Sequence, residues 1–415
     1  MKFSFIDLFA GCGGLSLGLE QAGFHPVYVN ELNTDALNTY LVNRSEYKHL
    51  SLNEFHSNDI KELTGSKKSL SKLSKNLKTK FNINKGDLSL IVGGPPCQGY
   101  SGIGHRRTYK VDKKEIPSNY LYKEMVKVIN HFNPKGYIFE NVRGLLSARW
   151  TKNGKKGEIF QDVLKQFKTL KNYNFIYSLV QSKDHGVPQN RPRILLVGIR
   201  KDINSKITKD NVFPKQDSTY PNLGELLSDL IDNNYDKNFT NNKYLSEPKT
   251  NIQKILRTKK NGNSILKKGD ELTDQEYSKH SMHVIRKFKY MINNNGKIPP
   301  KFKTKKFAQR LLPKKWNGKG PNITATSLPD DYVHFSQPRS LTVREWARLQ
   351  MFPDWYEFVG KRTTGGTRRA GNPRKGIHDR EVPKYTQIGN AVAIPLARVV
   401  GEHFIRLLKN NPRDF

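Results

Sequence analysis

The sequence predicts an α/β fold in which helices cover both faces of a parallel sheet, joined to a smaller, loop-rich domain. Over the first two hundred residues, short apolar runs alternate with stretches of helical spacing. Several runs end in turns of glycine or polar residues, which is typical of the strands of open α/β sheets. Beyond Lys201 the chain becomes polar and rich in Lys and Asn, and its periodicity is weak. The sheet is therefore expected first in the chain and the loop-rich domain after it.

Each expected element follows from its apolar spacing and from the residues that bound it. The expected strands are 3–9, 27–30, 88–92, 136–139, 175–179 and 194–199. The expected helices are 15–22, 66–80, 120–132, 160–170, 339–350 and 391–408. The helix over 66–80 carries six lysines and no acid, with three leucines at helical spacing. We expect it to be a solvated amphipathic helix that lies on the sheet.

The change of composition sets the expected domain boundaries. A first domain would span 1–200 and be completed by 385–415, and a second would span 201–384. The second includes a basic insert at 361–384, with eight Lys or Arg against two acids. Two interpretations of this insert stay open, a surface insert without fixed structure and a strand that follows phosphates.

Charge indicates a polyanionic partner. The 415 residues carry a formal net charge of +35, from 72 Lys and Arg against 37 Asp and Glu. Such an excess favours nucleic acid or an anionic membrane surface. No apolar run is long enough to predict a spanning helix, and the N-terminus lacks the pattern of a secretory signal. The two cysteines, Cys12 and Cys97, lie in turns of small residues, which predicts no disulfide framework and fits a reducing cytoplasm.

A glycine-rich turn follows the first strand. The turn, residues 7–14, opens the next helix, and its glycines would let the backbone approach a ligand closely. Glu31 ends the second strand, where a carboxylate can accept both hydroxyls of a ribose. Together the two features predict an adenosyl ligand, although the spacing departs from the full dinucleotide fingerprint.

A more specific motif follows the third strand of the sheet. In residues 93–101, two glycines and two prolines rigidify a turn that carries Cys97. A cysteine held at the carboxyl end of a parallel strand is exposed and positioned, which suits a nucleophile. Cys12, inside the glycine turn, is expected instead to be a small buried side chain.

Two further motifs border the same edge of the sheet. Glu140 ends an apolar strand, and its pKa would tend to rise there, as a proton donor requires; an ion-paired or capping glutamate is the alternative. Arg191 and Arg193 alternate in an extended segment, so both guanidiniums would lie on one side. They could hold a carbonyl oxygen or a phosphate, or form a surface basic pair.

Taken together, these motifs resemble those of cytosine-C5 DNA methyltransferases of bacterial restriction–modification systems. The resemblance covers residues 2 to about 230 and 322–407. Eight blocks occur in the order typical of the family, at residues 7–14, 31, 59–60, 95–98, 140–142, 189–193, 339–345 and 387–392. The resemblance implies a Rossmann-like sheet that binds S-adenosylmethionine, a target-recognition domain and no metal. The 361–384 insert departs from the shorter pattern of the family.

The resemblance also implies a cofactor site. Phe9 would pack on the adenosyl group, the Gly11 turn would cradle the methionine moiety, and Glu31 would hold the ribose. Asp59 would accept from the adenine amino group. The complete implied set is Phe9, Gly11, Gly13, Glu31, Leu32, Asp59, Ile60, Gly94, Pro96, Leu121, Asn390 and Val392.

The implied mechanism begins with a thiolate. Cys97 would add to carbon 6 of a flipped cytosine, and protonated Glu140 would share its proton with ring N3. Arg193, with Arg191 beside it, would hold the O2 atom. Gln98 and Ser101 would contact DNA near the extruded nucleotide.

The resemblance leaves a rival function and implies further partners. The rival is a tRNA cytosine-C5 methyltransferase, which the long segment 201–322 and the Gln98 that follows Cys97 disfavour. A non-catalytic DNA-binding relative is disfavoured by the intact catalytic motifs, and a dinucleotide oxidoreductase by the Pro-Pro-Cys turn. The expected partner is double-stranded DNA, modified by a monomer in the bacterial cytoplasm. A cognate restriction endonuclease would act on the same site without stable binding.

Overall fold

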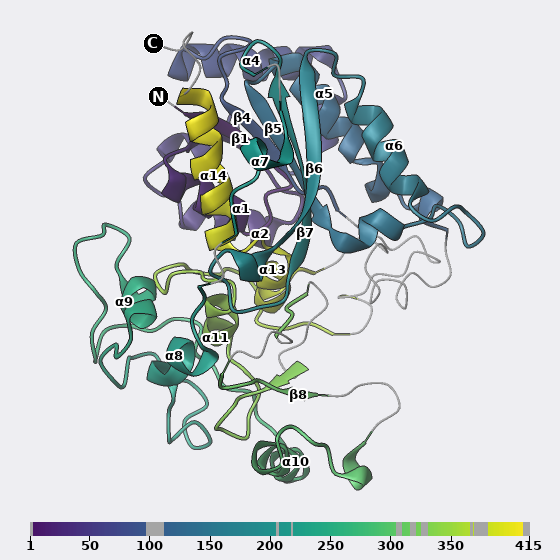
Figure 1. The fold of residues 1–415 in the computed structure, drawn as a ribbon. Helices are drawn as coiled ribbons and strands as arrows, with labels where there is room; N and C mark the ends of the chain where they lie inside the picture. Colours follow the sequence, from purple (N-terminus) through teal and green to yellow (C-terminus); the bar gives the residue numbers. More distant parts are fainter. Residues whose placement is uncertain are drawn as a thin grey trace.

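The computed structural model describes residues 3–96, 112–204, 207–216, 219–303, 309–315, 321–324, 331–365, 368 and 381–409. Figure 1 shows a sheet with its helices at one end of the molecule and a loop-rich region at the other. We call the described residues within 3–216 and 381–409 the sheet region, and those within 219–368 the lower region. The closing helix α14 runs beside the sheet, so the C-terminal segment returns to the part formed by the N-terminal segment.

The main sheet of the described residues has seven strands in the order β3-β2-β1-β4-β5-β7-β6. Its strands are β1 (Ser4–Leu8), β2 (His25–Asn30), β3 (His56–Ser57), β4 (Leu90–Gly93), β5 (Gly136–Val142), β6 (Tyr173–Gln181) and β7 (Pro192–Arg200). Strands β3, β2, β1, β4 and β5 pair in parallel. Their carboxyl ends therefore lie at one edge of the sheet.

The expectation of a fully parallel sheet was wrong in one place, because β7 runs antiparallel to both of its neighbours. The reason is the length of the preceding connection. A parallel return needs a crossover of a dozen or more residues, whereas antiparallel strands accept a short link. The chain between β6 and β7, residues 182–191, holds only a 3₁₀ turn. Strand β7 therefore reverses direction.

The helices of the sheet region lie on both faces, as the sequence predicts (Figure 1). They are α1 (Gly14–Ala22), α2 (Thr34–Val42), α3 (Ile60–Thr64), α4 (Lys67–Phe81), α5 (Tyr122–Phe132), α6 (Glu158–Phe167), α7 (Lys209–Val212) and α14 (Ile394–Lys409). Helix α13 (Lys384–Asn390) packs instead with the lower region, in one core cluster with Leu341 and Trp346. Strand residues alternate between two cores. In β1, Phe5 packs with α1 and α14, whereas Ile6 packs with α4, α5 and α6. This alternation is the period-two pattern of a strand buried on both faces.

Small residues let α1 and α14 pack closely. A Cβ on Gly18 would meet the Ala397 Cβ at 2.4 Å and the Ile394 carbonyl oxygen at 2.6 Å. A Cβ on Gly401 would meet the Ala22 Cβ at 2.9 Å. The C-terminal helix is thereby fixed against the helix that begins at the glycine-rich turn.

The lower region has short elements joined by long loops. Its α-helices and strands among the described residues are α8 (Leu223–Leu227), α9 (Asn251–Arg257), α10 (Met282–Asn293), α11 (Val343–Arg348), β8 (Arg310–Leu311) and β9 (Tyr332–Val333). The 3₁₀ turns in the described parts of the chain are η1 (Lys48–Ser51), η3 (Lys113–Glu115), η4 (Pro117–Tyr120), η5 (Arg143–Ser147), η6 (Ser182–Asp184), η7 (Ser228–Leu230) and η8 (Pro300–Phe302). Helix α11 is shorter than the expected 339–350 helix, because Thr342 caps it with a capping box to Glu345.

The expected amphipathic helix over 66–80 is confirmed as α4. Its leucines Leu70, Leu73 and Leu77 are buried in the core, and its lysines are exposed. Within the described ranges, no helix combines the length and apolarity needed to cross a membrane. Most of the basic insert, residues 366–367 and 369–380, lies outside the described residues.

Candidate active site at the carboxyl edge of the sheet

Most of the predicted site residues lie at one edge of the sheet. Phe9 follows β1, Glu31 follows β2, Asp59 follows β3 and Gly94 follows β4. Glu140 lies inside β5, close to its carboxyl end. In open α/β sheets this edge is where ligands bind. The parallel strands therefore gather residues that are far apart in the sequence.

The glycine-rich turn between β1 and α1 is held in an uncommon backbone conformation. Phe9, Gly11 and Gly13 all have positive φ, at 58°, 57° and 83°. A Cβ on Gly11 would meet no described atom within 4 Å, whereas one on Gly13 would meet Arg44 Nη1 at 2.7 Å. Gly11 therefore faces open space, and Gly13 faces the packed interior.

Glu31 is anchored by backbone amides. One oxygen, Oε2, accepts from the Gly11 N–H at 2.8 Å, and the other, Oε1, accepts from the Asn33 N–H at 2.8 Å. Burial raises the pKa of Glu31 above its ordinary value, and these two amide donors act to lower it. Each oxygen keeps a further lone pair. A carboxylate fixed in this way can still accept a pair of vicinal hydroxyls.

The segment after β3 lies beside Glu31. The Asn58 side-chain amide donates to the Glu31 carbonyl at 3.3 Å, and Asp59 caps α3 by accepting from the Lys61 N–H at 2.9 Å. Ile60 is buried, whereas Leu32 is 65 % exposed. An exposed leucine beside a held carboxylate provides an apolar surface that a flat ring could cover. The donor set thus fits the adenosyl part of S-adenosylmethionine.

Leu121, Asn390 and Val392 complete the expected cofactor set. Val392 is buried, Asn390 is exposed, and Leu121 is partly buried at the N-cap of α5. A Cβ on Gly14 would meet the Val392 carbonyl oxygen at 2.6 Å. The segment before α14 therefore packs directly against the start of α1.

Glu140 and Arg193 form a close pair on neighbouring strands. Arg193 Nε lies 2.6 Å from Glu140 Oε1, and both side chains are mostly buried. The pairing of β5 with β7 places Val142 opposite Arg193 and so brings the two side chains together. Burial raises the pKa of Glu140, and the guanidiniums of Arg193 and Arg191 offset part of that rise. A carboxyl with a raised pKa beside a fixed guanidinium can donate a proton and orient an acceptor at one place.

The turn that leads to Cys97 is fitted around Glu140. A Cβ on Gly94 would meet Glu140 Oε2 at 2.8 Å, so only glycine allows the carboxylate this close. The Asn141 side-chain amide donates to the Pro95 carbonyl at 3.1 Å. The role of Asn141 was missed from the sequence, although its motif was noticed. It fastens the proline turn to the strand that carries Glu140.

Arg191 and Arg193 have different partners, although both guanidiniums lower the pKa of Glu140. The Arg191 guanidinium is buried and donates to the carbonyls of Ile323, Gly389 and Ala391. Arg193 faces Glu140. Arg191 thereby joins the sheet region to the lower region and to the α13–α14 connection. Its carbonyl partners lie far away in sequence and give no local signal.

Cys97, Gln98 and Ser101 lie outside the described residues, and their predicted roles stay predictions. Cys12 is described, and the expectation of a small buried side chain is confirmed. It is 1 % exposed, its Sγ donates to the Gln387 carbonyl at 3.4 Å, and burial raises the pKa of its thiol to about 12. A thiol in this state is a poor nucleophile at neutral pH.

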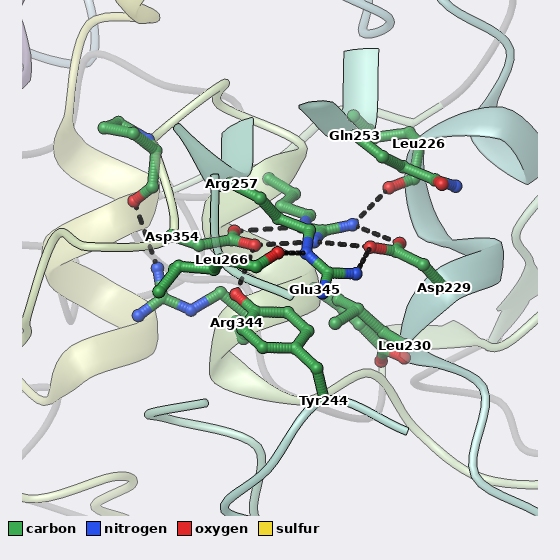
Figure 2. Close-up of polar contacts among 12 residues, drawn as sticks. Leu226, Asp229, Leu230, Tyr244, Gln253, Arg257, Leu266, Arg344, Glu345 and Asp354 are labelled. Atoms are coloured by element: carbon green, nitrogen blue, oxygen red, sulfur yellow. Dashed lines mark hydrogen bonds and ion pairs between the residues drawn. The ribbon is translucent and has the colours of Figure 1, made fainter. Parts of the chain in front are cut away.

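A cluster of buried charges around α11 in the lower region was also missed by the sequence analysis. Arg348 Nη1 donates to Asp229 at 2.6 Å, and Arg348 Nη2 donates to Asp354 at 2.6 Å. Figure 2 shows the contacts of this cluster, in which Arg257 also donates to Asp229 and Tyr244 donates to Asp354. Helix α11 was expected to have one apolar face, but all of its residues are buried. Each of its charged side chains has a polar partner, as Arg348 has Asp229 and Asp354. The cluster joins segments of the lower region into one unit.

Comparisons with known proteins agree with this geometry. The family model for C-5 cytosine-specific DNA methylases matches residues 3–406. The type II methyltransferase M.DdeI of Desulfomicrobium norvegicum is 28 % identical, over 98 % of this chain and 89 % of its own length. The type II methyltransferase M1.HphI of Haemophilus parahaemolyticus is also 28 % identical, over 99 % of this chain and 88 % of its own.

A solved structure extends the likeness to the fold. A DNA modification methyltransferase encoded within an E. coli prophage aligns with a TM-score of 0.67, at 22 % identity, over 98 % of this chain and 100 % of its own. The mixed sheet with flanking helices is thus the Rossmann-like fold that the sequence predicts. The family model spans nearly the whole chain, and the chain belongs to the C-5 cytosine-specific DNA methylase family.

Proposed function

We propose that this chain transfers a methyl group from S-adenosylmethionine to carbon 5 of a cytosine flipped out of double-stranded DNA. The observation that carries the proposal is the Glu140–Arg193 pair, 2.6 Å apart, beside the Gly94–Pro95 turn that leads into Cys97. A proton donor and a guanidinium held beside a turn with a cysteine suit an attack on a pyrimidine ring. Membership of the family supports the same reaction.

The cofactor would lie between the glycine-rich turn and the ends of β2 and β3. Glu31 would accept the ribose hydroxyls, Asp59 the adenine amino group, and Leu32 would cover a face of the adenine. Phe9 would pack on the adenosyl group. When bound, S-adenosylmethionine supplies an electrophilic methyl group on a sulfonium. The amide donors on Glu31, from Gly11 and Asn33, support this arrangement because they fix the carboxylate before a ligand arrives.

The chemistry of the ring would be carried by the chain's own residues. The Cys97 thiolate bonds to carbon 6 while N3 takes the proton of Glu140, which leaves an enamine whose carbon 5 is nucleophilic. Arg193 donates to O2 and keeps the ring in register. After carbon 5 has gained the methyl group, it loses its proton to a base. The electron pair of that C–H bond expels the Cys97 sulfur as a thiolate, N3 returns its proton to Glu140, and the aromatic ring is restored.

The lower region would be the target-recognition domain, within the proposed boundaries 201–384. Residues 277–329 contain 13 Lys or Arg and no Asp or Glu. Helix α10 lies in this stretch, with its apolar side on β8 and β9 and Arg286, Lys289 and Tyr290 exposed. Such a surface fits the phosphates of a duplex, and contacts of this kind make affinity fall steeply with salt. Gln98 and Ser101 would contact the DNA beside the flipped base.

The setting we propose is a bacterial restriction–modification system. The named relatives are type II methyltransferases. The chain would then act as a monomer in the cytoplasm and protect DNA from an endonuclease that reads the same sequence.

A transfer assay tests the proposal. The protein is incubated with S-adenosylmethionine labelled on its methyl group and with either duplex plasmid or tRNA. We expect label in the plasmid, and bisulfite sequencing should find 5-methylcytosine in one sequence context. Cys97→Ala should abolish transfer, and Cys12→Ala should preserve it. Label in tRNA alone would reject the DNA assignment, and full activity of Cys97→Ala would reject the nucleophile.

A further inference from the structure

The backbone of the proposed cofactor turn is held from its inner side. Phe9, Gly11 and Gly13 have left-handed φ values, a conformation that persists only where the surroundings over-determine it. Two carbonyls of the turn point into the protein. The Cys12 carbonyl accepts from the Tyr356 hydroxyl at 2.5 Å, and the Gly13 carbonyl accepts from Arg44 Nη2 at 3.1 Å.

The two donors are bonded to each other and fully buried. Arg44 Nη1 donates to the Tyr356 hydroxyl oxygen at 3.1 Å, and Arg44 Nε lies 2.6 Å from Glu20 Oε1. The Arg44 guanidinium also stacks on Tyr40, 3.8 Å from the ring centroid. Arg44 is 1 % exposed and Tyr356 is 0 % exposed. We call Arg44 and Tyr356 the inner clamp.

The inner clamp connects the turn to the lower region. Tyr356 lies after α11, and its backbone carbonyl accepts from Arg344 Nη2 at 2.9 Å. The same Arg344 nitrogen donates to the Thr273 hydroxyl at 2.6 Å. One chain of hydrogen bonds therefore leads from the lower region through Arg344 and Tyr356 to the carbonyl of Cys12.

We propose that Tyr356 and Arg44 are positioning residues for the cofactor, because they set the two peptide planes at the start of α1. The inference rests on the proposed cofactor site and adds to it two residues that are remote from the ligand's expected contacts. Without the Tyr356 hydroxyl, the Cys12 carbonyl stays buried without its donor and the turn relaxes. Pre-organisation is lost, and the cofactor binds more weakly.

The test compares two buried tyrosines that each donate to a backbone carbonyl. Tyr356→Phe removes the bond to Cys12, and Tyr385→Phe removes a bond of 2.7 Å to the Leu341 carbonyl, away from the turn. Binding of S-adenosylmethionine and S-adenosylhomocysteine is measured by calorimetry without DNA, together with Tm, kcat and KM. A second variant, Arg44→Lys, keeps the charge beside Glu20 and loses the fork that reaches Gly13.

We expect Tyr356→Phe to raise the Kd for both ligands by about 5- to 30-fold, with a matching rise in KM and little change in kcat at saturation. Arg44→Lys should do the same, and Tyr385→Phe should lower Tm but leave the Kd within about twofold. Equal Kd values for Tyr356→Phe and the wild type would overturn the inference. A wild type that binds neither ligand would overturn the proposed function itself, which is a separate result.

Discussion

The two regions of the molecule bury charge in opposite ways. At the carboxyl edge of the sheet, burial raises the pKa values of Glu31 and Glu140. In α11 of the lower region, burial would also raise the pKa of Glu345, but the Arg339 guanidinium lowers this pKa to about 2. Arg348 likewise lowers the pKa of Asp354 against the effect of burial.

The difference separates the carboxyl groups that we propose for catalysis and cofactor binding from those that hold the structure together. The Glu345 carboxylate accepts from Arg339 at 2.6 Å and 2.8 Å, a bidentate pair that satisfies both oxygens. Glu31, by contrast, accepts from two neutral backbone amides within the described part of the chain. A fully neutralised buried carboxylate is costly to separate from its partner, whereas partial neutralisation leaves capacity for a ligand or a proton.

The largest expected effect is on catalysis, from Glu140→Gln. The amide cannot donate a proton to the ring, so kcat should fall by about 10²- to 10⁴-fold. Because the pKa of Glu140 is raised and its protonated form acts, wild-type activity should decline as pH rises through that pKa. Stopped-time methylation assays across pH check both points. Glu402→Gln, on an exposed helix face, is the control, and a Glu140→Gln variant as active as that control would remove Glu140 from the mechanism.

Breaking the buried charge cluster should reduce stability. Arg348→Met leaves Asp229 and Asp354 buried without their shared guanidinium, which costs about 3–5 kcal/mol. Thermal unfolding followed by circular dichroism measures the loss. The matched control is Lys165→Met, which removes the exposed ion pair with Asp162 at 3.6 Å and should cost at most about 1 kcal/mol. Similar losses in the two variants would contradict the structural role of the cluster.

Asp7, near the end of β1, should make the free energy of unfolding depend on pH. Burial raises its pKa to about 7 in the folded protein, from about 3.9 in an unfolded chain. Between these values the folded state holds the proton and the unfolded state has released it. The contribution of Asp7 to stability therefore falls as pH rises from about 4 to about 7, by about 4 kcal/mol in all, and levels off above that. Asp7→Asn should remove this contribution from the pH dependence measured by urea unfolding, whereas Asp162→Asn at the surface should keep it.

The smallest of these effects is on cofactor affinity. Glu31→Gln keeps one oxygen acceptor but turns an amide group toward a backbone N–H, so the side chain loses its fixed position. We expect the Kd for S-adenosylmethionine to rise by about 10- to 100-fold, because this is the loss of affinity that follows from losing one hydrogen bond to a charged group. Calorimetry measures it, with Glu62→Gln, in the exposed first turn of α3, as control. An unchanged Kd would mean that the ribose lies elsewhere.

Local signals in the sequence predicted most of the sheet region. The parallel strands are short apolar runs. Because their carboxyl ends lie at one edge of the sheet, the residues that follow them could be predicted to lie close together. The short link 182–191 also indicates that β7 runs antiparallel to β6, because a parallel return needs a longer connection. The prediction of a parallel sheet did not take the length of this link into account. The glycine and proline pattern marked the segment after β4, where the described structure places Gly94 against Glu140; Cys97 lies outside the described residues.

The rest depended on partners that no local pattern reveals. Arg344 and Arg348 have the spacing of an ordinary helix surface, and they are buried because partners far away in sequence, such as Thr273 and Asp229, meet their guanidiniums. The Tyr356 bond to Cys12 joins residues 344 positions apart. Such contacts form only when segments far apart in the sequence pack together, so a local sequence pattern cannot predict them.

Covalent trapping distinguishes Cys97 from Cys12 as the residue that bonds to the cytosine ring, the step on which the proposed reaction depends. A duplex that carries the target sequence with 5-fluorocytosine is incubated with the protein and S-adenosylmethionine. Fluorine cannot leave as a proton does, so the adduct should persist through denaturing electrophoresis, and mass spectrometry should locate it on Cys97. An adduct on Cys12, or turnover of the fluorinated duplex without any adduct, would contradict the account.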